Sequence, residues 1–233
     1  MHGLLATLAM YRRATARAAA LTLANWPVLV TVFVYSVIMT GALLMGGLLG
    51  FAGGVLVSLV WAACVGSFLY LVEMMIRTSR VSLEDFRRSF GAYLWDVVGV
   101  TFILWIFFAL VTPALASLER GPVLHLALVL VLFVLFNAVP ELIYLGHFSS
   151  LQLLRESYVF IGENWVEWFP VSFAMLLVLA AVAAPDLPPL LGWVRSALIG
   201  LLVYFAMVLR GLLFLELHGS SRRTRIFRHR MGG

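Results

Sequence analysis

Three residues inside apolar stretches have the types and spacing that could support chemistry. Glu141 and Arg210 carry opposite charges, and Asn137 lies one helical turn before Glu141. A charged side chain at the centre of a membrane helix costs at least about 2.5–3.5 kcal/mol, so each one needs a partner or a function. The candidate intramembrane polar locus is therefore Asn137, Glu141 and Arg210. It would serve as a structural ion pair that closes the bundle, or as a path for a substrate or proton.

Pro140 directly precedes Glu141. Because proline has no backbone N–H, it leaves a carbonyl of the preceding turn without its helical donor. The position predicts a kink in this stretch, close to the polar locus.

Several other chemistries are excluded by composition. The chain contains no Lys, so all 16 basic residues are Arg, which excludes a Walker A loop and Schiff-base catalysis. A single cysteine, Cys64, excludes intramolecular disulfides and thiolate zinc clusters. His125 and His147 have no second ligand at helical spacing, and no hydrolase or metalloprotease motif occurs. We therefore expect no enzyme, no catalytic, cofactor-binding or metal-binding residue, and no cofactor.

The composition is that of a membrane protein. Hydrophobic residues make up 63% of the chain and charged residues 12%, against about 45–50% and about 25% in soluble proteins. A bilayer core of about 30 Å requires roughly 20 apolar residues per helix. The stretches that qualify are 27–48, 54–76, 94–115, 122–145, 168–184 and 190–214. The sequence thus predicts an all-α polytopic membrane protein with six transmembrane helices.

Arginine is distributed unevenly between the two ends of these spans. One side holds the segment before the first span, the second and fourth connections, and the C-terminal tail, which contain most of the arginines. The other side holds only Arg120 and Arg195. Cytoplasmic loops carry the positive excess, so we expect both termini to be cytoplasmic.

The segments that precede alternate spans resemble one another. Ser82-Leu-Glu-Asp-Phe-Arg-Arg-Ser-Phe90 aligns with Ser150-Leu-Gln-Leu-Leu-Arg-Glu-Ser-Tyr158, and each is followed by a tryptophan, Trp95 or Trp165. Asn25-Trp26 matches Asn164-Trp165 and marks a third copy.

Apolar residues recur at helical spacing in these segments, which is typical of helices that lie in the membrane interface. An ordinary helical loop packed on the bundle is the alternative. The predicted organisation is three repeated hairpins, each preceded by an interfacial amphipathic helix, within one membrane domain. Its units are residues 1–76, 77–145 and 146–217, followed by a basic cytoplasmic tail at 218–233.

The spacing of Gly46, Gly50 and Gly54 has two interpretations. It matches a small-xxx-small helix contact, and it also coincides with the predicted turn between the first two spans. We favour the turn.

The repeat segments 81–100 and 149–169 resemble the repeat of the YciC-like bacterial inner-membrane proteins. They are also similar to the membrane domain fused to some glycerophosphodiester phosphodiesterases. The resemblance implies six spans with elbow-like helices before alternate spans, and it brings no catalytic residues. With the arginine distribution, it places the chain in the bacterial cytoplasmic (inner) membrane as a multi-pass protein.

Several arginines are candidates for contact with lipid headgroups. They lie in the predicted interfacial helices and in the tail, where arginine attracts anionic lipids. The candidates are Arg87, Arg88, Arg155, Arg222, Arg223 and Arg225. The tail would alternatively dock an acidic protein, and we expect no nucleic-acid binding.

Two functions remain. The first is a non-enzymatic scaffold, accessory subunit or lipid-organising component, whose partners are anionic lipids and other membrane-protein subunits. The alternative is a small permease or channel for an apolar or lipid-like solute. Transporters often combine internal repeats with helices broken near mid-membrane, whereas Pro140 is predicted nearer the cytoplasmic face.

Overall fold

The computed structural model describes residues 2–146, 148, 150–184 and 189–218, and the described part is helical throughout its regular elements. The helices in chain order are α1 His2–Ala24, the 3₁₀ turn η1 Trp26–Leu29, α2 Val30–Leu48, α3 Phe51–Thr78, α4 Leu83–Ala92, α5 Leu94–Ala116, α6 Gly121–Leu135, α7 Val139–Glu141, the π-helical segment η2 Leu142–Gly146, α8 Ser150–Ala183 and α9 Pro189–His218. The described residues include six helices long and apolar enough to cross a membrane, as the sequence predicts.

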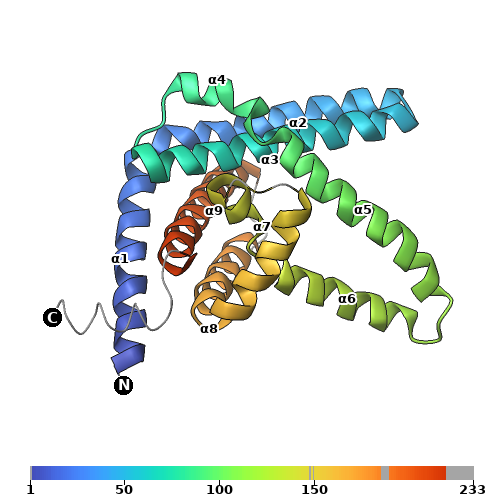
Figure 1. Cartoon of the computed structure of the whole chain (residues 1–233). Helices are drawn as coiled ribbons and strands as arrows, with labels where there is room; N and C mark the ends of the chain where they lie inside the picture. Colours follow the sequence, from blue (N-terminus) through green and yellow to red (C-terminus); the bar gives the residue numbers. More distant parts are fainter. Residues whose placement is uncertain (1, 147, 149, 185–188, 219–233) are drawn as a thin grey trace.

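The spans pair as hairpins, α2 with α3, α5 with α6, and α8 with α9. In Figure 1 the α2–α3 hairpin and the α5–α6 hairpin diverge from each other toward their loops. Buried side chains concentrate at the opposite end, in residues 69–76, 138–144 and 204–217. We call this end of the bundle, defined by those three ranges, the packed end. The outer halves of the hairpins expose apolar side chains, which requires a lipid surrounding.

An amphipathic segment precedes each hairpin and packs on the second span of another one. α1 packs along α9, α4 packs along α3, and α8 contacts α6, α7 and η2. The contact of α1 uses one helical stripe, in which Met10, Ala14, Ala18 and Leu21 are buried. The arrangement is therefore cyclic, because the first segment packs on the last helix.

Two serines at aligned positions of the repeat tie these segments to the spans. The hydroxyl of Ser89, on α4, lies 2.5 Å from that of Ser67 on α3. The hydroxyl of Ser157, on α8, donates to the carbonyl of Leu135 at the end of α6 (2.8 Å). Each serine thus bonds to a span of the preceding hairpin, Ser89 to a hydroxyl and Ser157 to a backbone carbonyl.

The junctions between amphipathic segment and span differ locally. Trp26, Trp95 and Trp165 are all exposed, 64%, 73% and 60% respectively, as expected of residues at a membrane boundary. α1 and α4 each end before the span that follows. Pro27 lies in η1, between α1 and α2, and Tyr93, between α4 and α5, is not helical.

The third amphipathic segment continues into its span without a break. α8 extends from Ser150 to Ala183 as one helix, whereas the sequence suggests an interfacial helix before a span that begins at residue 168. The side chain of Asn164 donates to the carbonyl of Phe160, four residues earlier, a bond that a continuous helix accommodates.

The turn between α2 and α3 is made by glycine. Gly50 precedes α3 with φ +56° and ψ −127°, a conformation open to glycine alone. Next to this turn the two helices touch, because a Cβ on Gly53 would overlap the carbonyl of Gly46. The favoured turn is therefore present at Gly50. The close helix contact joins Gly46 to Gly53, while Gly54 has open space around it.

Candidate functional site

The helix that begins as α6 is broken immediately before Glu141. Residues 136–138 are turns between α6 and α7, and Pro140 has no N–H for the carbonyl of Phe136. That carbonyl accepts instead from the N–H of Val139 (3.1 Å). The carbonyl of Leu135 accepts from the Ser157 hydroxyl, so a neighbouring helix supplies a donor that the broken helix lacks. At the position of the predicted kink, a three-residue turn interrupts the regular helix.

Arg210 of α9 lies against this interruption and pairs with Glu141. Its Nε donates to Oε1 of Glu141 at 2.7 Å, and its Nη2 donates to Oε2 at 3.0 Å. The Glu141 side chain is fully buried, and 14% of the Arg210 side chain is exposed. The geometry is a two-pronged ion pair within the packed end, linking α7 to α9.

The remaining donors of Arg210 also have acceptors. Nη2 donates to the backbone carbonyl of Asn137 (2.6 Å), and Nη1 donates to the side-chain oxygen of Asn137 (3.2 Å). A longer bond joins Nη1 to the hydroxyl of Ser172 on α8 (3.4 Å). A guanidinium has five N–H donors, and these contacts together with the two to Glu141 account for all five.

Trp168, on α8, completes the cluster. Its indole N–H donates to the Asn137 side chain at 2.9 Å, and its ring centre lies 4.8 Å from the guanidinium carbon of Arg210. A cation over a tryptophan face is stabilised by the electrons of the ring. We call Asn137, Glu141, Trp168, Ser172 and Arg210 the arginine cluster.

The packing beside the arginine cluster is tight. The hydroxyl of Tyr144, in η2, donates to the carbonyl of Met207 on α9 (3.2 Å). A Cβ on Gly211 would lie 2.6 Å from that hydroxyl and 2.5 Å from the side chain of Ile76. Glycine after Arg210 therefore allows η2 and α3 to approach α9 closely.

The structure thus brings together the three residues of the predicted polar locus. It adds Trp168 and Ser172, which the sequence reasoning did not include. The two are four residues apart on one face of α8, and this spacing of two hydrogen-bonding side chains within a span is a signal that could have identified them.

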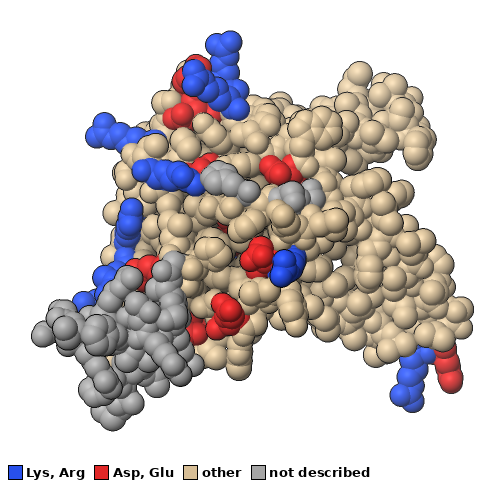
Figure 2. Space-filling view, viewed as in Figure 1, with Lys and Arg blue, Asp and Glu red and all other residues tan. Residues whose placement is uncertain are grey.

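The predicted headgroup arginines occupy different environments. Arg87 and Arg88 are exposed on α4, and Arg88 pairs with Glu84 at 2.9 Å. Arg155 is exposed on α8. Figure 2 shows basic side chains along the side of the molecule that carries α1 and α4. Arg222, Arg223 and Arg225, with the rest of the tail from residue 219, lie outside the described residues.

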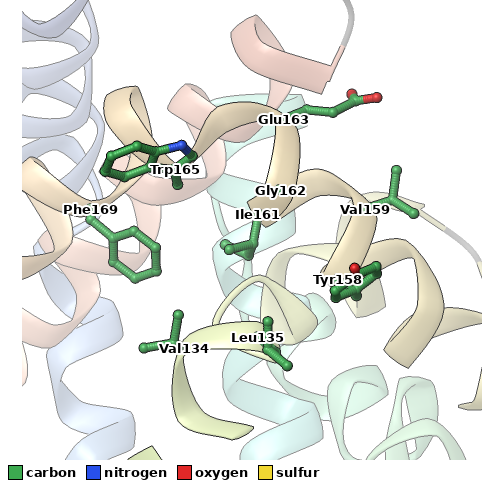
Figure 3. A pocket seen from close by; sticks show the side chains of 9 residues that line it. All are labelled: Val134, Leu135, Tyr158, Val159, Ile161, Gly162, Glu163, Trp165 and Phe169. Atoms are coloured by element: carbon green, nitrogen blue, oxygen red, sulfur yellow. The ribbon is translucent and has the colours of Figure 1, made fainter. Parts of the chain in front are cut away.

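An apolar groove adjoins the interruption in the α6 helix. It lies between the end of α6 and the first half of α8 and has a volume of about 660 Å³. The lining is Val134, Leu135, Tyr158, Val159, Ile161, Gly162, Glu163, Trp165 and Phe169 (Figure 3). We call it the α6–α8 groove. None of the five residues of the arginine cluster lines it.

Within the described residues, no group of three or more His, Cys, Asp and Glu side chains is placed to hold a metal ion. Comparisons with known proteins identify no relative: no family profile, no curated protein and no solved structure matches the chain.

Proposed function

We propose that this chain is a non-enzymatic integral membrane protein that acts as a scaffold, accessory subunit or lipid-organising component. The observation that carries the proposal is the arginine cluster. Arg210 has a protein acceptor for every N–H, and Glu141 is fully buried. A binding or proton-transfer site needs groups that can exchange partners, whereas this arrangement favours a permanent clasp between helices.

The α6–α8 groove supports the same proposal. Its wall is apolar along Val134, Leu135 and Ile161, and exposed Trp165 lies at one side. Such a groove suits lipid chains or an apolar face of another membrane protein. The sequence resemblance to the YciC-like proteins supports a location in the bacterial cytoplasmic membrane, and the arginine distribution supports cytoplasmic termini.

A small permease for an apolar or lipid-like solute is the second candidate. It is favoured by one observation, the interruption at residues 136–138 directly after the groove residues Val134 and Leu135. Interrupted membrane helices often surround the binding sites of transporters.

Copurification in mild detergent tests the first proposal. We expect a stoichiometric membrane-protein partner or a fixed complement of lipid to be recovered with the chain. A matched pair of variants examines the groove. Gly162→Leu fills it, because a Cβ at Gly162 meets nothing within 4 Å, and Gly91→Leu makes the same change in open space on α4.

We expect Gly162→Leu to reduce the recovery of the copurifying partner or lipid, and Gly91→Leu to leave that recovery unchanged. Solute flux through the purified chain in liposomes would overturn the scaffold proposal, and loss of that flux in Gly162→Leu would establish the permease instead.

A further inference from the structure

A second groove runs along α4, the amphipathic helix before the second hairpin. Its volume is about 540 Å³, and it is lined by Leu83, Glu84, Phe86, Arg87 and Phe90. Leu83 is 84% exposed, although it lies at the start of the apolar face of the helix. Phe86 and Phe90 are partly buried, and their rings pack on each other and on Tyr35 of α2. The groove therefore has a firm aromatic wall and an open apolar edge.

The charges around this groove leave one cation of its lining without an acidic partner. Glu84 is paired with Arg88, and the carboxylate of Asp85 accepts from the backbone and hydroxyl of Ser82 in a capping box. Among the described residues, no acidic side chain pairs with Arg87. Arg87 follows Leu83 by four residues, so the free guanidinium lies beside the exposed leucine on the helix surface.

The loop that leads into α4 also contains an arginine that is not paired with an acidic side chain among the described residues. Arg77 pairs with Glu73 at 2.8 Å, while exposed Arg80 has no acidic partner in the described part of the chain. Figure 2 shows the acidic and basic side chains of this region gathered on one projecting part of the molecule. α4 carries two acidic and two basic side chains, so Arg80 gives the helix and the loop before it an excess of one positive charge.

We propose that the α4 groove is a binding site for an anionic phospholipid, in which Arg87 binds the headgroup phosphate and Leu83, Phe86 and Phe90 hold the start of an acyl chain. A phospholipid combines these two chemistries, and a guanidinium can bind phosphate through two parallel N–H groups. Exposed Trp95, at the start of α5 directly after α4, is of a residue type that is enriched where headgroups meet acyl chains. The inference rests on the proposed function, which locates the chain in a membrane, and it adds the class of lipid that is bound.

Arg87 and Arg155 form a matched pair for the test. Both are exposed, and Gln in either place removes one positive charge, but only Arg87 lines the groove. Arg88 is unsuitable as the control because it pairs with Glu84, which also lines the groove. Binding of phosphatidylglycerol, against phosphatidylcholine as the neutral probe, is measured on the purified full chain by native mass spectrometry. We expect Arg87→Gln to weaken phosphatidylglycerol binding at least about fivefold, which corresponds to the roughly 1 kcal/mol that one arginine contributes at an anionic surface.

Arg155→Gln is expected to retain wild-type binding. Leu83→Gln should weaken the binding of both lipids without changing the charge. Because Leu83 is 84% exposed, the substitution leaves the packing of the fold intact. Equal losses in Arg87→Gln and Arg155→Gln, or no loss in either, would overturn the proposal. Release of a protein partner by Arg87→Gln with unchanged lipid binding would also overturn it.

The result is separable from the test of the proposed function. If the wild-type chain binds both lipids equally, the lipid site is refuted, but a copurifying protein partner still supports the scaffold. If the chain conducts solute, the scaffold is refuted, but selective phospholipid binding at Arg87 still supports the lipid site.

Discussion

The backbone carbonyl of Asn137 accepts a hydrogen bond from Nη2 of Arg210 at 2.6 Å. In an uninterrupted helix this carbonyl would accept from a backbone N–H four residues later. The interruption in the fourth span and the charge in the sixth therefore form one structural unit, because the guanidinium serves both the exposed backbone and the buried carboxylate of Glu141.

Neutralising one partner of this ion pair is expected to destabilise the protein strongly. Glu141→Gln or Arg210→Gln leaves an uncompensated buried charge, so each should lower the free energy of unfolding by about 3–5 kcal/mol. The double variant should lose clearly less than the sum of the two. Thermal or denaturant unfolding in detergent measures the cycle, and strict additivity would reject direct pairing.

Retaining the charge of Arg210 is expected to be insufficient. Arg210→Lys keeps one positive charge but provides a single ammonium in place of the planar guanidinium with its five donors. We expect Arg210→Lys to be markedly less stable than the wild type in the same unfolding measurement. Wild-type stability would mean that charge alone, and not the contacts to Asn137 and Ser172, holds the cluster together.

The contact between α2 and α3 predicts opposite effects at neighbouring glycines. Gly53→Ala places a methyl group on the carbonyl of Gly46 and should separate the two helices, with a loss of stability. Gly54→Ala meets nothing within 4 Å and should be neutral, or stabilising by up to about 1 kcal/mol through helix propensity. Melting temperatures of the two variants decide the matter, and equal values would contradict the contact.

Asn25 is expected to protect the loop between α3 and α4 from proteolysis. Its side chain donates to the carbonyl of Ser79 (3.1 Å) and accepts from the N–H of Val81 (2.8 Å). Asn25→Ala removes both bonds, each worth about 1 kcal/mol, so trypsin should cleave after Arg80 faster. Asn164→Ala, at the matching repeat position, should leave cleavage at Arg80 unchanged; mass spectrometry identifies the site.

Cysteine labelling tests the predicted orientation. In a Cys64→Ser background, a membrane-impermeant maleimide applied to intact cells should modify Ser117→Cys in the α5–α6 loop. Arg80→Cys and Leu151→Cys, both exposed, should react only after permeabilisation. Labelling of Arg80→Cys and Leu151→Cys from opposite sides would contradict the repeated-hairpin arrangement.

Much of the architecture follows from sequence because hydrophobic length and tryptophan position are local properties. A count of consecutive apolar residues predicts the six spans. The alignment of the segments before alternate spans predicts the positions of the exposed Trp26, Trp95 and Trp165. Arg210 and Glu141 were also recognisable, since unpaired charge in a membrane span is expensive and a span offers few possible partners.

Other features depend on contacts between distant segments and therefore could not be predicted from the sequence. Trp168 and Ser172 join the arginine cluster only because α8 lies against the interrupted helix. The π-helical segment after Glu141 and the pairing of Gly46 with Gly53 likewise result from packing, which helix propensity does not encode.

The packing of α1 on α9 has a consequence for biosynthesis. The stripe of Met10, Ala14, Ala18 and Leu21 leaves the ribosome long before its partner helix, and every intervening hairpin enters the membrane in the meantime. We therefore expect a chain truncated before α9 to leave this stripe of α1 without its partner helix.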